Sequence, residues 1–264
     1  MLDQKNYSTI RIEKRPDGVA LATLNRPEKL NAVNGDLHHE LTTLPRDADS
    51  DRDVRALVIT GAGRAFCAGG DFSPGSVPLG SRGTPAFEEG RRVVDHLLEC
   101  SKPVISAVNG YAMGLGATVA LLCDVVVAAR SAVFADTHVV MGIGAGDGGQ
   151  LIWPLLVGVN RAKYYLMTGE RVNAEEAERI GLVSFVVDDA ELMPRALAIA
   201  TRLAQGPAQA IAASKGAINQ WMRSISASVL PHSLALESAC FGSADNREAV
   251  AAFNEKRRPD FRRT

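Results

Sequence analysis

The chain has few cysteines and no long apolar run, and each shortage argues against a class of protein. Its four cysteines lie far apart and form no CxxC or Cys/His spacing, which argues against a disulfide framework and a zinc site. The most apolar segment, residues 115–129, is interrupted by Asp124 and is too short to span a bilayer. The N-terminus lacks the apolar stretch of a secretory signal. We therefore expect a cytoplasmic protein that keeps its thiols reduced and has no membrane partner.

Charge of one sign is also lacking, because the formal net charge is only -1 over 264 residues. Such a chain has no overall field that attracts nucleic acid or an acidic membrane, so any anion must bind through a local arrangement of donors. With 46% hydrophobic and 22% charged residues, the composition is that of a globular protein. Its length allows one large core and an appended subdomain.

The first half of the chain alternates β-branched runs with helical patterns. Short apolar runs bounded by Gly, Pro and Asn predict strands, which begin near Tyr7, Val19, Val54, Pro103 and Asp124. Helices are predicted between them, at residues 36–44, 87–100 and 115–123. This alternation favours an α/β fold whose sheet strands are buried on both faces.

Beyond residue 160 the chain is rich in alanine and is predicted to be helical, apart from a strand pattern at residues 182–187. The predicted helices are residues 161–167, 174–180, 192–204, 208–221 and 247–253. Pro207 and Pro231 stand where helices are expected to start or end. We place a boundary near Gly206, with a core domain over residues 1–206 and a helical subdomain over residues 207–264.

Two glycine-rich segments offer backbone amides to an anion. Residues 56–72 run from an apolar strand into a bend at Gly70, where amides can point into a cleft without interference from a Cβ atom. Residues 106–124 turn through Gly114 into an apolar helix, whose first amides are unpaired and lie at the positive end of its dipole. Neither segment matches a nucleotide-binding loop. The alternative interpretation is that these glycines only permit tight turns and close packing.

Five motifs follow one another along the chain: NRPEKLNAVN, AFCAGGDF, NGYAMGLGA, LMTGERVNAEEAERIGLV and FNEKRRPDF. In content and order they resemble the signatures of the crotonase (enoyl-CoA hydratase/isomerase) superfamily, and they cover nearly the whole chain. The resemblance implies a crotonase (ClpP-like) spiral of ββα units with a helical C-terminal region that packs in a trimer or in a hexamer of two trimers. It also implies a site for an acyl-CoA thioester, with no metal and no cofactor other than the CoA of the substrate.

The same resemblance implies which residues hold the thioester. The amides of Gly70 and Leu115 would bind its oxygen while that atom carries enolate charge. Further residues implied in substrate and CoA binding are Lys29, Leu30, Arg64, Ala68, Gly114, Thr118 and Lys256, the last from a neighbouring subunit. For each single cation in this set, a solvated surface charge is the alternative.

Two positions depart from the hydratases of this superfamily, which use two glutamates to position water and exchange its proton. Thr118 and His138 stand there instead, and a threonine cannot act as a base near neutral pH. Nine residues after His138, Asp147 lies in a glycine-rich loop. An imidazole oriented by a carboxylate can take a proton from water. Together with Glu237, this His/Asp pair resembles the β-diketone hydrolase branch of the superfamily, of the 6-oxocamphor hydrolase type.

These residues predict an enzyme, either an enoyl-CoA hydratase-like lyase or a C–C hydrolase. His138, oriented by Asp147 and Glu237, is expected to activate water for addition to an enoyl-CoA or for cleavage of a β-keto acyl-CoA. Two alternatives are a β-diketone hydrolase that needs no CoA and a non-catalytic acyl-CoA binding protein.

Other polar residues have structural interpretations. His138 is read alternatively as a hydrogen-bonded structural residue, and Asp147 as a cap for a helix that begins near Gly148. Asp71 is expected to cap the turn that follows Gly70. The remaining histidines are expected at the surface or in packing, and they are His38, His39, His96 and His232.

Overall fold

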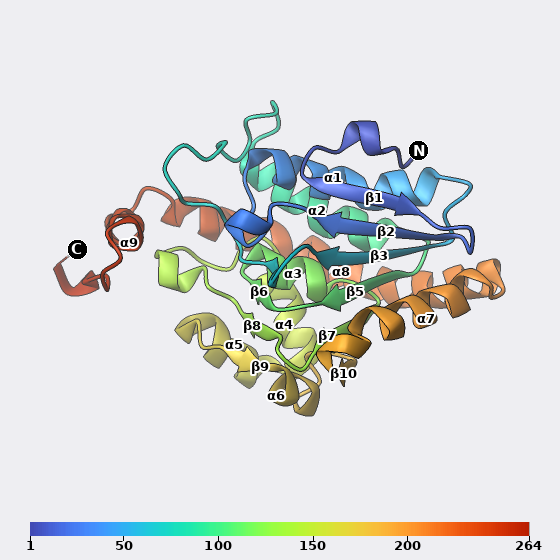
Figure 1. The fold of residues 1–264 in the computed structure, drawn as a ribbon. Helices are drawn as coiled ribbons and strands as arrows, with labels where there is room; N and C mark the ends of the chain where they lie inside the picture. The colour runs from blue at the N-terminus through green and yellow to red at the C-terminus, as the bar shows by residue number, and fades with distance from the viewer. Residues whose placement is uncertain (264) are drawn as a thin grey trace.

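The computed structural model describes residues 1–263 and contains two β-sheets covered by helices (Figure 1). The larger sheet is mostly parallel, and only β1 and β2 pair in the antiparallel sense. In spatial order its strands are β1 (Ile10–Lys14), β2 (Val19–Leu24), β3 (Ala56–Gly61), β5 (Val104–Val108), β7 (Val125–Ala129) and β10 (Phe185–Val187). The strands predicted from the sequence are all present in this sheet.

A second, four-stranded sheet was not predicted from the sequence. Its strands are β4 (Ala65–Cys67), β6 (Tyr111–Met113), β8 (Val133–Ala135) and β9 (Val172–Asn173). Consecutive strands alternate between the sheets, because β3, β5 and β7 join the larger one and β4, β6 and β8 the smaller. Helices α2 (Ala86–Glu99), α3 (Leu115–Leu121) and α4 (Gly149–Val157) follow the three pairs in turn. The predicted α/β fold and its spiral of ββα units are confirmed.

Helices cover both faces of the larger sheet. On one face, α7 (Leu192–Ala204) packs on β3, β5 and β7 around a cluster of Val, Ile and Ala side chains. On the other, the main core lies beneath α1 (Gly35–Ser50) and α2, which pack against each other. The remaining helices are α5 (Val159–Thr168), α6 (Ala174–Arg179), α8 (Ala208–Cys240) and α9 (Ala244–Asn254). Short 3-10 turns span Gln4–Asn6, Pro27–Lys29, Val139–Met141, Asp189–Glu191 and Phe261–Arg263.

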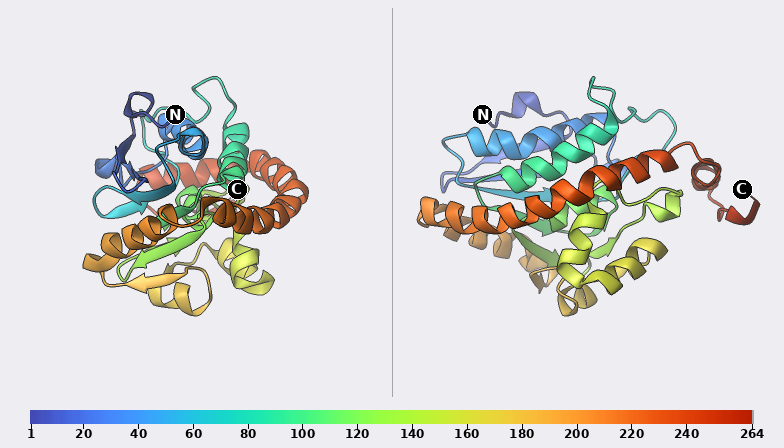
Figure 2. Two further views of the ribbon diagram at one scale, coloured as in Figure 1. Left: turned by 90° about the vertical axis from the view of Figure 1, so that its right-hand side faces the viewer. Right: turned by 180° about the vertical axis from the view of Figure 1, so that it is seen from behind.

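The C-terminal region contains one long helix where the sequence predicted a break. Pro207 caps α8 as expected, but Pro231 lies inside this helix, so the prediction that a helix starts or ends there is wrong. The helix continues through Pro231 because its inner face stays buried against α2 and α4. Figure 2 shows α8 running across the back of the molecule, with α9 projecting beyond its end. The proposed domain boundary near residue 206 stays a prediction.

Within residues 1–263, no helix combines the length and the apolar character that crossing a bilayer requires. All four cysteines are free thiols, and three of them are buried.

Gly116 joins α3 to β4 through a close contact. A Cβ atom there would lie 2.5 Å from the Cys67 carbonyl oxygen and 2.7 Å from Cys67 Cβ. We expect Gly116→Ala to lower the free energy of unfolding by about 1–3 kcal/mol through overpacking, measured by urea denaturation. Gly216→Ala is the matched control, because a Cβ in the middle of α8 meets nothing within 4 Å. It should raise stability by about 0.5–1 kcal/mol, and an equal loss in both variants would contradict the packing argument.

Candidate functional site

A cavity of about 280 Å³ opens between the two glycine turns and the C-terminal half of α8. Most of its wall is apolar, and the larger side chains are Phe72, Leu79, Phe87, Met141, Ile143, Leu234 and Phe241. Four ionisable side chains interrupt this wall, namely His38, His138, Asp147 and Glu237. An apolar pocket with a few converging polar groups is the usual form of a small-molecule site.

The two predicted amide turns line this one cavity, which includes both Gly70 and Leu115. They lie close together, because a Cβ atom on Gly114 would be 3.8 Å from the Gly69 Cα atom. Gly70 is held by a parallel bridge to Val33. Leu115 is the first residue of α3, so its amide has no partner within the helix. The backbone therefore offers donors from two segments, distant in sequence, to one space.

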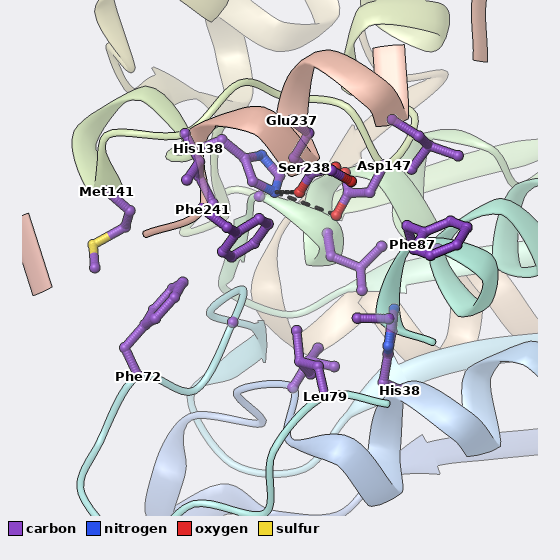
Figure 3. Close-up of a pocket in the computed structure, with 18 of the residues that line it drawn as sticks. His38, Phe72, Leu79, Phe87, His138, Met141, Asp147, Glu237, Ser238 and Phe241 are labelled. Carbon is purple, nitrogen blue, oxygen red and sulfur yellow. Dashed lines mark ion pairs between the residues drawn. The ribbon is translucent and has the colours of Figure 1, made fainter. Parts of the chain in front are cut away.

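His138 lies between two carboxylates. Its Nδ1 atom is 2.7 Å from Asp136 Oδ1, and its Nε2 atom is 3.2 Å from Asp147 Oδ2. The glycine-rich loop after β8 thus folds back and brings Asp147 to the ring, while Glu237 Oε1 reaches from α8 to 4.0 Å of Nε2 (Figure 3). Asp136 was not predicted, although its D-x-H spacing to His138 was a visible signal; it also accepts a hydrogen bond from the His138 backbone amide.

The carboxylates decide the charge of His138. Burial opposes the cationic ring, but the charges of Asp147 and Asp136 and their hydrogen bonds outweigh it and hold the pKa of His138 well above its usual value. Burial likewise opposes the charge of Asp147, yet His138 keeps the pKa of Asp147 below its usual value. At neutral pH His138 is therefore an imidazolium that donates from both nitrogens, and Asp147 is ionised.

Glu237 is in the opposite state from Asp147. Burial, together with the negative charges of Asp147 and Asp136, raises the pKa of Glu237 to about 8, although His138 works against the shift. Glu237 is therefore a protonated acid at neutral pH. Two carboxyl groups whose surroundings separate their pKa values are the usual sign of an acid and a base with different tasks.

The same three side chains are the ones that could hold a metal ion. Ligand atoms of His138, Asp147 and Glu237 lie within 4.8 Å of one another. The set is poorly suited to a cation, since an imidazolium already neutralises Asp147 and the third ligand carries a proton. The absence of a metal site stays a prediction.

His38 was interpreted from the sequence as a surface or packing residue, and the structure places it in the interior, where it also lines the cavity. It is 3% exposed, packs between α1 and α2, and lines the cavity. Its Nδ1 atom lies 2.9 Å from Oε2 of Glu89, which is 1% exposed. The signal that could have found it is its place beside the Leu37–Leu41–Leu44 stripe of a helix, where a polar residue is drawn inward.

Thr118 does not line the cavity. It is fully buried in α3, and a Cβ atom on Gly148 would lie 2.6 Å from its methyl group. Neither Thr118 Oγ1 nor Asp147 Oδ1 makes a hydrogen bond of ordinary geometry within residues 1–263, yet the hydroxyl helps to lower the pKa of Asp147. Thr118 therefore interacts with Asp147, and its role in substrate binding stays a prediction.

The residues predicted to bind the CoA moiety lie outside the cavity wall, except for Gly114. Ala68 donates its amide to the carbonyl of Leu30, and Lys29 Nζ lies 3.5 Å from Ser73 Oγ, so all three adjoin the Gly70 turn. Arg64 is exposed at the end of β3. Lys256 is exposed after α9, on the projecting end of the chain. Their roles stay predictions.

The smaller structural predictions fare differently. Asp71 accepts hydrogen bonds from Ser73 and pairs with Arg26, so it caps the turn as expected. Asp147 does not cap α4 through its side chain, because Gly148 is the N-cap and no side-chain bond is made there. His39 is partly buried against Glu89, His96 bonds to the Thr42 carbonyl, and His232 is exposed on α8.

The family model, the sequence relatives and the solved structure named below all carry an enoyl-CoA hydratase description. Residues 14–264 match the family model described as enoyl-CoA hydratase/isomerase. The chain is 41% identical over 260 residues to a probable enoyl-CoA hydratase of Rhodobacter capsulatus, covering 97% of this chain and 98% of the relative. It is 37% identical to the short-chain-enoyl-CoA hydratase of Clostridium acetobutylicum, covering 91% and 92%. A crystal structure of an enoyl-CoA hydratase/isomerase from Mycobacterium paratuberculosis superposes with a TM-score of 0.86 at 38% identity, covering 93% and 98%.

Proposed function

Because this chain belongs to the enoyl-CoA hydratase/isomerase family, we propose that it binds a short enoyl-CoA in the cavity and adds water to the conjugated double bond. The observation that carries the proposal is that Glu237 lines the same cavity as the two amide turns, 4.0 Å from His138 Nε2, where burial raises its pKa to about 8. The thioester oxygen lies between the amides of Gly70 and Leu115. These donors stabilise the enolate more than the ground state, since the negative charge on that oxygen develops only as water adds.

Glu237 then supplies the proton that the α-carbon of the enolate needs. Its pKa near 8 keeps it protonated at neutral pH while leaving the proton easy to give. The sequence suggested that His138 activates water, but an imidazolium held by Asp136 and Asp147 is suited to donate. In the proposed reaction His138 stabilises the Glu237 carboxylate that forms, because its Nε2 atom lies 4.0 Å from Glu237 Oε1.

A second candidate reaction is hydrolytic C–C cleavage of a β-keto acyl-CoA, and the cationic ring of His138 favours it. A buried imidazolium with two flanking carboxylates can polarise the β-carbonyl group of such a substrate. After water adds to that carbonyl, the C–C bond breaks and the leaving group is the same thioester enolate. The matching positions of His138, Asp147 and Glu237 in the β-diketone hydrolase branch are consistent with this reaction. A CoA-independent diketone hydrolase and a non-catalytic acyl-CoA binder complete the candidates.

One substrate panel separates them. The pure protein is incubated with crotonyl-CoA, a β-keto cyclic acyl-CoA and a free 1,3-diketone, and the loss of each chromophore is followed. We expect turnover of crotonyl-CoA and a loss of about 10²-fold in kcat for His138→Gln, because the ion stabilising the Glu237 carboxylate is gone. Turnover of the diketone alone would replace the proposed hydratase with a CoA-independent diketone hydrolase. Turnover of none of the three substrates would favour the non-catalytic acyl-CoA binding protein.

We also propose that the chain assembles as a trimer or as a hexamer of two trimers. Large apolar side chains remain exposed on and after α8, and among them are Ile218, Trp221, Phe241 and Phe253. Exposed apolar surface of this kind marks contact sites. The molar mass in solution, measured by light scattering, tests the proposal, and a monomer would contradict it.

A further inference from the structure

Hydration needs a group that takes a proton from water, and three of the four ionisable side chains in the cavity are unsuited to it. His138 and Glu237 already carry a proton at neutral pH. Asp147 is ionised, but its lowered pKa makes it a weak acceptor, its Oδ2 atom is paired with His138, and its Oδ1 atom is buried. The fourth side chain is His38.

His38 is held in one orientation by a buried carboxylate. Its Nδ1 atom lies 2.9 Å from Glu89 Oε2, and His39 approaches the other oxygen of the same carboxylate at 3.3 Å. Burial alone would favour neutral Glu89, but the hydrogen bonds from His38 and His39, and their charge when they are protonated, hold the pKa of Glu89 below its usual value. An ionised carboxylate accepts only, so Nδ1 of His38 must carry hydrogen.

The other nitrogen of His38 is free to act. Nε2 makes no hydrogen bond to any of residues 1–263, and the ring forms part of the cavity wall. In the neutral ring, hydrogen on Nδ1 leaves a lone pair on Nε2. Figure 3 shows the ring rising from α1 toward the part of the cavity where Phe87 and Asp147 lie. A histidine with one nitrogen fixed by a carboxylate and the other open to a substrate is the usual arrangement of a general base.

The position of His38 also brings it close to the proposed acid–base groups. Gly90 follows Glu89 on α2, and a Cβ atom there would lie 3.5 Å from Asp147 Cβ. Helix α2 thus positions His38 through Glu89 and contacts Asp147 through the next residue. When His38 takes up a proton, its charge helps to lower the pKa of Asp147, so the two side chains interact across the cavity.

We propose that His38 is the catalytic base of this site and that Glu89 is its positioning residue, an inference that rests on the proposed hydration. The Nε2 lone pair of His38 takes a proton as the water oxygen bonds to the β-carbon and the π electrons move toward the thioester oxygen. Glu237 then gives its proton to the α-carbon. The net change is addition of one water molecule, and the proton on His38 returns to Glu237 through solvent when the product leaves.

The experiment uses crotonyl-CoA and the variants His38→Ala and His38→Gln. We expect kcat to fall by about 10²-fold or more in both, with KM changed little, because the base acts only in the transition state. Added imidazole should restore His38→Ala in proportion to its concentration. The glutamine variant keeps a donor for Glu89, so it remains informative if the alanine variant unfolds.

His96→Ala is the matched control, since His96 lies on the neighbouring helix α2 and likewise bonds through Nδ1 but does not line the cavity. It should keep its activity and gain nothing from imidazole. For Glu89→Gln we expect kcat to fall with KM changed little, because an amide does not fix the orientation and tautomer of the His38 ring as an ionised carboxylate does. The charged groups around the ring are Glu89, His39 and Asp147. A residue that only joins α1 to α2 would change stability and leave kcat of the folded enzyme unchanged.

The outcomes separate the inference from the proposed function. If the wild type hydrates crotonyl-CoA and a folded His38→Gln is equally fast, the assignment of His38 is wrong and the hydratase proposal stands. If the wild type does not hydrate enoyl-CoA at all, both proposals are overturned. Loss of activity without rescue by imidazole in a folded His38→Ala would assign His38 a packing role only.

Discussion

Replacing Gly114 by alanine is expected to lower kcat/KM for crotonyl-CoA by about 10²- to 10³-fold, the usual cost of losing one oxyanion donor. Gly114 has φ 51° and ψ -125°, a conformation that residues with a Cβ atom rarely adopt. An alanine would relax toward negative φ and turn the peptide that carries the Leu115 amide. Its Cβ would be in ordinary van der Waals contact with His138, 3.5 Å from Cε1, so the expected loss comes from the backbone and not from a clash.

A second strained glycine provides the control. Gly75 also has positive φ, at 77°, but a Cβ there meets nothing within 4 Å and the residue is not in the cavity wall. Gly75→Ala carries a similar backbone cost and should keep activity within about twofold of the wild type, as surface changes usually do. Both variants are first shown to be folded by thermal unfolding. A folded Gly114→Ala with wild-type kcat/KM would mean that the Leu115 amide does not bear the developing charge.

The larger elements of the fold could be predicted because each carries its own periodic signal. The central strands of the six-stranded sheet are mostly buried and rich in β-branched residues, and β5 is buried at all five positions. The strands β4, β6 and β8 span only three residues each, too few for an alternation to stand out from a turn. The prediction of a helix boundary at Pro231 was wrong for a related reason. A proline is a local signal for a helix end, whereas α8 is stabilised by packing along its buried face.

The site was only partly predictable, since its four ionisable side chains come from parts of the chain as far apart as α1 and α8. Asp147 and His138 were paired from their spacing, and their 3.2 Å contact bears out that proximity. His38 and Glu89 are 51 residues apart on two helices, and nothing in either local pattern indicates that they meet. The charge states depend on this convergence, because Asp147 and a second carboxylate, Asp136, together raise the pKa of His138. The sequence therefore indicated where chemistry occurs more reliably than which group gives or takes a proton.

Replacing Glu237 by glutamine should make the enzyme slower and, at alkaline pH, more stable. The amide cannot give a proton to the enolate, so kcat should fall by about 10²-fold. In the wild type, kcat should decline as pH rises through about 8, where Glu237 loses its proton. The folded protein binds this proton more tightly than the unfolded chain, whose carboxyl titrates near 4.5. The stabilisation is thus complete below pH 4.5 and is lost as pH rises through about 8.

Glutamine does not titrate, so its advantage over glutamate should grow across this same window. We expect the free energy of unfolding of Glu237→Gln, relative to wild type, to rise by roughly 2–4 kcal/mol between about pH 5 and about pH 9, measured by urea denaturation at several pH values. Glu13→Gln, an exposed carboxyl on β1, is the control and should show a flat difference. A flat difference for Glu237→Gln as well would mean that Glu237 is ionised in the folded protein, and its role as the proton donor would then be untenable.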